Sequence, residues 1–174
     1  MSISLNRDNL KGFLSDADFS ELTGRISQAH NDLENRRNKG AEYTGWLHLP
    51  SSTPEKFLSE LKKLSKEIQK KSDAIVNIGI GGSYLGVRAA EEFLKEDLKL
   101  PIYYAGQNLS GDDYTGLFSA LKKKKITVVV ISKSGTTTEP ALGFRLVKKF
   151  MASKYSAKEL GKGLSVLPMR KMGR

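Results

Sequence analysis

The chain has 174 residues, of which 39% are hydrophobic and 28% are charged. This length and balance suit one soluble globular domain with a hydrophobic core, and they exclude a disordered chain. Because the sequence contains no cysteine, a disulfide framework and a thiolate metal site are excluded. The amino terminus is too polar for a signal peptide, and the apolar run 126–131 is too short to span a bilayer. We therefore expect a cytoplasmic protein without a membrane partner.

The net charge raises the question of nucleic acid, because it is +10 and a basic surface attracts phosphate. The segment 158–174 contains five basic residues against Glu159 alone, and the remaining positive charge is spread along the chain. The lysine run 122–125 precedes a strand pattern and is interpreted as a solvated turn. Binding to a phosphate backbone needs a clustered patch, so we expect no nucleic-acid partner. A nucleic-acid binder is the alternative that charge alone suggests.

The first 72 residues predict a helical leader. Apolar residues recur at helical spacing between residues 18 and 38, and Gly40 follows as a stop signal. The expected apolar face consists of Leu22, Ile26, Ala29 and Leu33. After a connector with glycine and proline, Thr53, Pro54 and Glu55 fit the cap and first turn of a second helix. Its expected buried stripe is Phe57, Leu61, Leu64 and Ile68.

Residues 73–160 predict alternating strands and helices. The apolar runs 74–78, 101–105 and 126–131 lack polar alternation, which is typical of strands buried on both faces. A helix pattern follows each run, and Asp112 or Asp113 is expected to open the second helix. The apolar positions of the first and third helices are Leu85, Ala89 and Phe93, and Leu142, Leu146 and Phe150. This order predicts an α/β domain, Rossmann-like, with a parallel sheet and helices on both faces.

The first strand ends in a glycine-rich loop, "NIGIGGSYLG" at residues 77–86. Gly79, Gly81 and Gly82 permit positive φ and a close approach of the backbone to a ligand. The next helix begins near Ser83 and offers unpaired N–H groups and the positive end of its dipole. Ligands bind at the carboxyl ends of parallel strands, so the loop predicts an anion site. A tight turn without a ligand is the alternative.

Two known phosphate-binding patterns do not fit this loop. A dinucleotide fingerprint requires a glycine at the position of Tyr84, and it prefers an acid near "YYAGQN", where none occurs. A P-loop requires a lysine after Gly86, where the chain has Val87. The sequence therefore predicts neither type of nucleotide site.

The third strand also ends in an unusual loop, "ISKSGTTTEP" at residues 131–140. Its hydroxyl residues are Ser132, Ser134, Thr136, Thr137 and Thr138. Thr136 and Glu139 have the spacing of a capping box, so helix capping explains one or two of the threonines. Capping does not explain Ser132 and Ser134, which a phosphate with several acceptor oxygens explains better. Lys133 either adds charge to that site or points into solvent.

Catalytic and metal-binding patterns are missing from both loops. His30 and His48 lie in the leader and are interpreted as surface or structural residues. No group of histidines and carboxylates has metal-ligand spacing, and no G-x-S-x-G elbow occurs. Glu139 is the carboxylate beside the loops, and we interpret it as a capping residue.

The two loops, "NIGIGGSYLG" and "ISKSGTTTEPALGF", resemble those of the glucose-6-phosphate isomerase family in its bacterial form. The segments "GWLHLP" and "YYAGQNLSGDDY" are also similar to that family. The resemblance runs from about residue 10 to residue 160. The family fold has two sugar-isomerase domains, and residues 73–160 resemble the first of them.

The resemblance implies that this domain holds the phosphate of a small-molecule sugar phosphate. By position, the phosphate-binding residues are Gly82, Ser83, Ser132, Ser134 and Thr137. Lys133 and Thr136 are neighbours whose backbone is expected to contribute to the same site.

The resemblance also implies the reaction, which interconverts glucose 6-phosphate and fructose 6-phosphate without a metal or cofactor. In the family a glutamate base moves a proton between C1 and C2 through an enediol, and a histidine and a lysine assist ring opening. These residues and an arginine follow the first domain, so we expect no catalytic residue in this chain. The complete enzyme is expected to be a homo-oligomer.

The last stretch, "GLSVLPMRKMGR", no longer resembles the family, in which another strand and the second domain should follow. We interpret residues 161–174 as a divergent basic tail produced by truncation or a frameshift. A genuine short single-domain protein is one alternative. A non-catalytic regulatory module that binds sugar phosphates is another, although the leader shows no helix-turn-helix of the kind such regulators usually carry.

Overall fold

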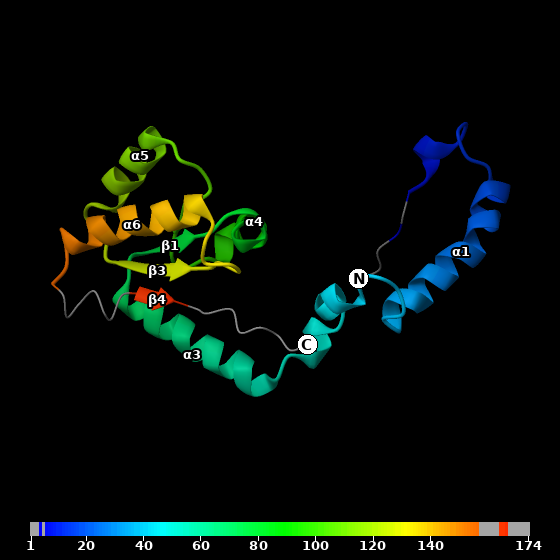
Figure 1. Ribbon diagram of the computed structural model, residues 1–174, viewed down its shortest axis with the longest axis horizontal. Helices are drawn as coiled ribbons and strands as arrows, with labels where there is room; N and C mark the ends of the chain where they lie inside the picture. Colours follow the sequence, from blue (N-terminus) through cyan, green and yellow to red (C-terminus); the bar gives the residue numbers. More distant parts are fainter. Residues whose placement is uncertain (1–3, 5, 157–163, 167–174) are drawn as a thin grey trace. The chain divides into compact units, whose positions relative to one another are not determined.

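The computed structural model describes residue 4, residues 6–156 and residues 164–166. The chain divides into two compact units, Met1–Glu55 and Lys56–Arg174 (Figure 1). The boundary that we placed after residue 72 stays a prediction.

The first unit is helical. Its elements are the 3-10 helix η1 (Asp8–Leu10), α1 (Asp16–Glu34), the 3-10 helix η2 (Ala41–Trp46) and α2 (Leu49–Ser52). A capping box starts α1: the Ser15 hydroxyl accepts from the Asp18 N–H at 3.3 Å, and the Asp18 carboxylate accepts from the Ser15 N–H at 2.7 Å. No residue of α1 is buried. The expected apolar face is present in the sequence but reaches solvent, with Ile26 61% exposed.

The second unit contains a sheet of four parallel strands in the order β2-β1-β3-β4. The strands are β1 (Ala74–Ile78), β2 (Ile102–Ala105), β3 (Ile126–Val130) and β4 (Leu164–Val166). Ile78 pairs with Ala105 on one side and with Val130 on the other. The carboxyl ends of the first three strands therefore lie together at one edge of the sheet.

Helices lie on both faces of this sheet. They are α3 (Glu55–Lys71), α4 (Leu85–Phe93), α5 (Gly111–Leu121) and α6 (Thr138–Ala152), with short 3-10 turns η3 (Gly81–Ser83) and η4 (Lys95–Asp97). In Figure 1, α5 and α6 cover one face and α3 lies on the other. The predicted α/β architecture with a parallel sheet is confirmed. Ser110, rather than Asp112 or Asp113, caps α5: its hydroxyl accepts from the Asp113 N–H at 3.3 Å.

The core of the second unit lies between the sheet and α5 and α6. Its largest completely buried side chains are Val76, Ile78, Leu121, Val128, Val147 and Met151. In α6 the buried line runs through Pro140, Gly143, Val147 and Met151. The line predicted from Leu142, Leu146 and Phe150 lies beside it, with Leu142 37% exposed. The small residues Pro140 and Gly143 form the buried line because the helix approaches the end of β2 closely.

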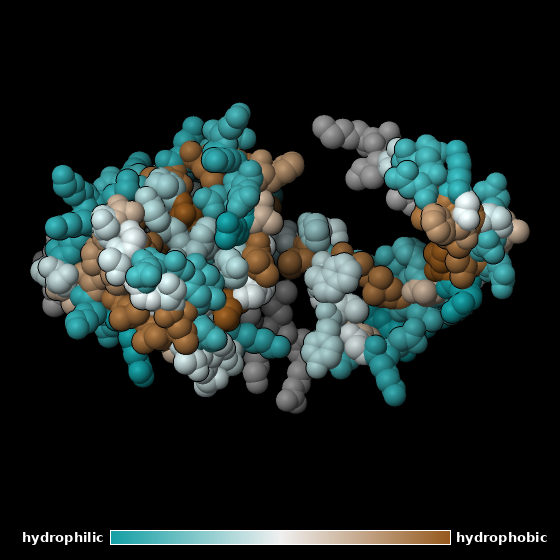
Figure 2. All heavy atoms as spheres, turned by 90° about the horizontal axis from the view of Figure 1, so that it is seen from above, coloured by the Kyte–Doolittle hydropathy of each residue, from teal (hydrophilic) through white to brown (hydrophobic). Residues whose placement is uncertain are grey.

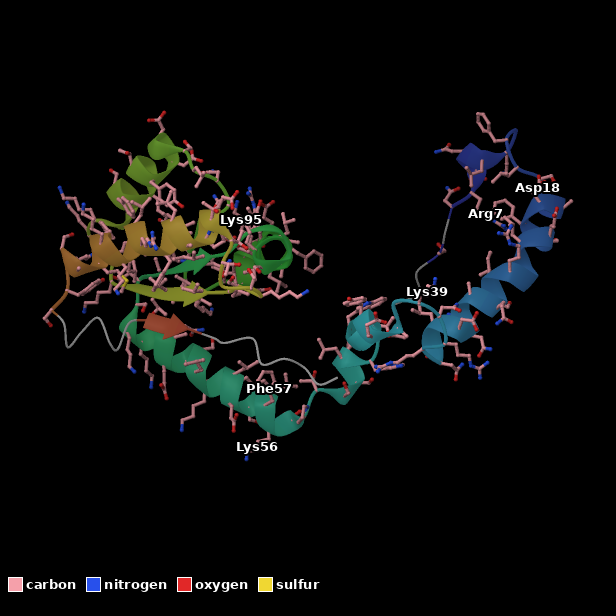
Figure 3. All side chains as sticks on the ribbon, in the orientation of Figure 1. Arg7, Asp18, Lys39, Lys56, Phe57 and Lys95 are labelled. Atoms are coloured by element: carbon pink, nitrogen blue, oxygen red, sulfur yellow. The ribbon has the colours of Figure 1, made fainter. Side chains whose placement is uncertain are left out.

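The predicted burial of the α3 stripe is only partial. Phe57 is 51% exposed and Leu61 is 40% exposed, whereas Leu64 and Ile68 are half-buried. Figure 3 shows Phe57 and Lys56 projecting from opposite sides of α3. A groove of about 370 Å³ separates part of α3 from the sheet residues Ile75 and Ile102. Apolar surface of this kind also appears as brown patches among polar side chains in Figure 2.

The strand β4 falls within the stretch that we set apart from the family. Leu164 pairs with Val128 and Val166 pairs with Val130, both in parallel. Strand patterns need at least about four residues to be recognised, so this three-residue run gave no signal. Residues 161–163 and 167–174 of the expected tail lie outside the described residues.

Candidate functional site: two loops at the carboxyl edge of the sheet

The two loops singled out in the sequence meet at one edge of the sheet. The Ile131 N–H donates to the Ile78 carbonyl at 2.9 Å, so the loop after β3 starts beside the loop after β1. The Gly79 N–H donates to the Ala105 carbonyl at 3.1 Å, which brings the end of β2 to the same place. In parallel sheets this carboxyl edge is where ligands bind.

The first loop is a tight turn that leads into α4. The Ser83 N–H donates to the Ile80 carbonyl at 3.1 Å, and the Tyr84 N–H donates to the Gly81 carbonyl at 3.0 Å. Gly81 has a φ of 56°, which favours glycine. A Cβ on Gly79 would lie 2.9 Å from the Ser83 Cβ, so close packing excludes a side chain there.

Gly82 differs from these two glycines, because neither its φ nor its neighbours require a glycine. It is exposed, and a Cβ built on it would meet no atom within 4 Å. Glycine at this position leaves the backbone accessible to a group outside the chain. The next residue, Ser83, is half-buried, and its carbonyl accepts from the side-chain amide of Asn77 at 3.4 Å.

The second loop is folded by hydrogen bonds to its own hydroxyl oxygens. The Ser132 oxygen accepts from the Gly135 N–H at 2.9 Å, and the Ser134 oxygen accepts from the Thr136 N–H at 3.2 Å. Gly135 allows this fold with a φ of 72°. A hydroxyl that accepts through its oxygen keeps its proton for donation. The arrangement therefore turns the loop into a set of oriented donors.

Helix capping does not consume these hydroxyls. The cap residue of α6 is Thr137, and its side chain makes no capping hydrogen bond. Its hydroxyl lies 3.3 Å from the Ser134 hydroxyl instead. The predicted capping box between Thr136 and Glu139 is therefore wrong: the helix starts one residue later than that spacing requires, and Glu139 lies in its first turn. Thr136 and Lys133 are exposed.

Three residues that the sequence reasoning missed fix the start of α6. The Gly106 N–H, just after β2, donates to the Tyr114 hydroxyl at 3.1 Å. A Cβ on Gly143 would lie 2.8 Å from the same hydroxyl. The first half of α6 is therefore pressed against the end of β2 and α5. The glycine directly after a strand in "YYAGQN" was the available signal.

An open groove lies away from both loops. It has a volume of about 920 Å³ and is lined by α4, the end of β2 and α5, without any of the candidate phosphate-binding residues. On its wall the Tyr104 hydroxyl donates to the Glu91 carboxylate at 2.6 Å. Burial, together with this hydrogen bond, raises the pKa of Tyr104 well above its usual value. We place the candidate site at the loops, because a phosphate is held by N–H and hydroxyl donors, which the loops supply.

The remaining candidates of the sequence lie elsewhere. His30 belongs to α1 and His48 precedes α2, both in the first unit. In the described part of the chain, no group of three or more histidine, aspartate or glutamate side chains could hold a metal ion. Among those same residues, no helix has the length and apolar character needed to cross a bilayer.

Comparison with known sequences shows which family the chain belongs to. The sequence profile described as phosphoglucose isomerase matches residues 27–167, which is most of the chain. The chain belongs to the phosphoglucose isomerase family. The resemblance seen in the two loops is confirmed, and the match extends over β4.

Curated relatives agree with this assignment. A glucose-6-phosphate isomerase of Clostridium novyi (strain NT) is 40% identical over 88% of this chain and 36% of its own length. The enzyme of Acholeplasma laidlawii (strain PG-8A) is 43% identical over 92% of this chain and 38% of its own length. The chain thus spans well under half the length of the curated relatives it matches.

Solved structures share the fold. A hypothetical protein from Thermus thermophilus superposes with a TM-score of 0.71 and 26% identity, over 84% of this chain and 34% of that protein. A glucose-6-phosphate isomerase from Chlamydia trachomatis gives a TM-score of 0.55 and 26% identity, over 63% of this chain and 22% of that enzyme.

Proposed function

We propose that this chain carries the phosphate-binding domain of a glucose-6-phosphate isomerase. The complete enzyme would interconvert glucose 6-phosphate and fructose 6-phosphate, an aldose–ketose isomerisation. One observation supports this most strongly: a loop of oriented hydroxyl donors lies beside a glycine turn that leads into a helix, at adjacent strand ends of a family member.

The proposed contacts follow from the donors that each loop offers. Ser132, Ser134 and Thr137 donate hydroxyl protons to the phosphate oxygens. Gly82 offers its backbone N–H and Ser83 its hydroxyl, with the positive end of α4 behind them, because the Ser83 N–H already donates to the Ile80 carbonyl. Lys133 adds its backbone N–H and the positive charge of its exposed side chain. The Thr136 N–H already donates to the Ser134 oxygen, so the Thr136 backbone contributes by holding that hydroxyl in place. Together they would stabilise a dianion by donating hydrogen bonds to its several acceptor oxygens, and Lys133 would offset part of its charge.

Holding the phosphate anchors the sugar but does not lower the chemical barrier. An anchor that binds substrate and transition state equally lowers the Michaelis constant without raising the turnover number. In the proposed reaction a base moves a proton between C1 and C2 through an enediol, which needs no metal or cofactor. We assign the base and the groups that assist ring opening to the part of the longer relatives that this chain does not span. A cytoplasmic location and a homo-oligomeric complete enzyme belong to the same proposal.

A titration of the 174-residue chain tests the proposal. Calorimetry would compare glucose 6-phosphate, fructose 6-phosphate and inorganic phosphate with glucose, which lacks the phosphate. Both sugar phosphates should bind, inorganic phosphate should compete with them, and glucose should give no signal. Equal heats for glucose and glucose 6-phosphate would contradict a site that recognises phosphate.

A further inference from the structure

We propose that Tyr104 and Glu91 are positioning residues for the phosphate site, acting through α4 and the turn before it. This inference rests on the proposed function, since it concerns the same phosphate. The Tyr104 hydroxyl, on β2, donates to the Glu91 carboxylate, on α4, at 2.6 Å. The hydrogen bond connects the sheet to the helix whose amino terminus faces the phosphate.

The helix α4 has little packing to hold it in place. None of its residues is buried: Leu85 at its start is 54% exposed and Phe93 at its end is 88% exposed. The groove of about 920 Å³ leaves open space between α4 and α5. Because burial contributes so little, the orientation of α4 depends on a few directed contacts.

Tyr104 makes two of these contacts. Its ring meets the Tyr84 ring edge to face, with centroids 5.8 Å apart and an interplanar angle of 62°. Tyr84 directly follows the glycine turn and caps α4. Through ring and hydroxyl, Tyr104 therefore contacts both the cap residue and the second turn of the helix.

The sheet supplies a third contact next to the first two. Asn77 of β1 is the parallel partner of Tyr104, and its side-chain amide donates to the Ser83 carbonyl at 3.4 Å. Asn77 and Tyr104, which are neighbours in the sheet, thus hold the glycine turn and α4 against the sheet. The raised pKa of Tyr104 keeps its hydroxyl protonated, and therefore a donor, into the alkaline range.

Affinity for phosphate depends on this alignment, because donors that are held in place lose less freedom on binding. Tyr104→Phe removes the hydroxyl and keeps the ring contact. Glu91→Ala removes the acceptor, whereas Glu91→Gln retains an acceptor oxygen and should restore binding. Tyr103→Phe is the matched control, since the Tyr103 hydroxyl has no hydrogen bond in the part of the chain that the structure describes.

Phosphorus NMR titration with inorganic phosphate measures the dissociation constant of each variant. The titration is carried out at a temperature where circular dichroism shows every variant to be folded. A loss of stability alone then leaves the dissociation constant unchanged. We expect Tyr104→Phe and Glu91→Ala each to raise the dissociation constant for phosphate about fivefold, since each variant loses the hydrogen bond between the tyrosine hydroxyl and the charged carboxylate. The variant that combines Tyr104→Phe with Glu91→Ala should bind phosphate no more weakly than the weaker-binding single variant, because both changes break the same contact.

The results separate this inference from the proposed function. If the unmodified chain binds phosphate and both variants bind it as well as Tyr103→Phe does, the positioning role is overturned and the phosphate site stands. If the unmodified chain binds no phosphate, the proposed function fails, and the positioning role fails with it. Glu91 is only half-buried, so its substitution keeps the test decisive even if Tyr104→Phe does not fold.

Discussion

Gly143 of α6 lies against Gly106, the residue that follows β2, so closely that a Cβ on Gly143 would come within 2.9 Å of the Gly106 nitrogen. The same Cβ would lie 2.8 Å from the Tyr114 hydroxyl, which accepts from Gly106. The start of α6, and with it the hydroxyl loop that precedes the helix, is held at the sheet edge by this contact between two glycines.

Gly143→Ala should therefore destabilise the protein. A methyl group has no room there, and overpacking costs about 1–3 kcal/mol. Gly116→Ala is the control, since a Cβ at this position of α5 would meet no atom within 4 Å. Alanine should stabilise that helix by about 0.5–1 kcal/mol. Urea unfolding measures the free energy of unfolding of both variants. If Gly143→Ala were as stable as the unmodified chain, the close contact would be refuted.

The net charge of +10 is expected to have no role in recognising nucleic acid. Duplex DNA should bind weakly, and its affinity should fall steeply as salt is added, because released counterions drive such binding. Fluorescence anisotropy with a labelled duplex at several salt concentrations measures this. Tight, sequence-selective binding at physiological salt would instead favour a nucleic-acid binder.

The chain alone is expected to lack isomerase activity. The loops supply hydrogen-bond donors for a phosphate. We assign the groups that move protons to the part of the longer relatives that this chain does not span. A coupled assay that converts fructose 6-phosphate to glucose 6-phosphate should give no turnover above background. Turnover of about 10 per second, close to the median for enzymes, from homogeneous material would show that catalytic residues lie within this chain.

The sheet and the candidate loops could be predicted from the sequence because their signals are local. Unbroken apolar runs marked β1, β2 and β3, since strands buried on both faces need no polar alternation. The serines of the second loop stood out because they precede any position from which a side chain could cap α6. The roles of Gly82, Ser83 and the hydroxyl residues themselves stay predictions.

Other features depend on contacts between distant segments. Nothing near Gly143 in the sequence predicts its contact with Gly106. The buried line of α6 was therefore predicted beside its true position. The apolar spacing of α3 identified a face suited to burial, but spacing does not reveal whether a neighbour fills the groove beside Leu61 and Leu64. Tyr104 and Glu91 belong to different elements, and only the fold brings them together.

The hydroxyl loop carries the central claim, and its most direct test is a comparison of two variants by titration with glucose 6-phosphate. Ser134→Ala combined with Thr137→Ala removes two donors, while Thr138→Ala removes an exposed neighbouring hydroxyl that has no hydrogen bond among the described residues. We predict that the double variant raises the dissociation constant by at least about tenfold, since each lost donor to a charged oxygen costs about 1–3 kcal/mol. Thr138→Ala should leave it unchanged. Equal dissociation constants for the unmodified chain and the double variant would contradict the phosphate site.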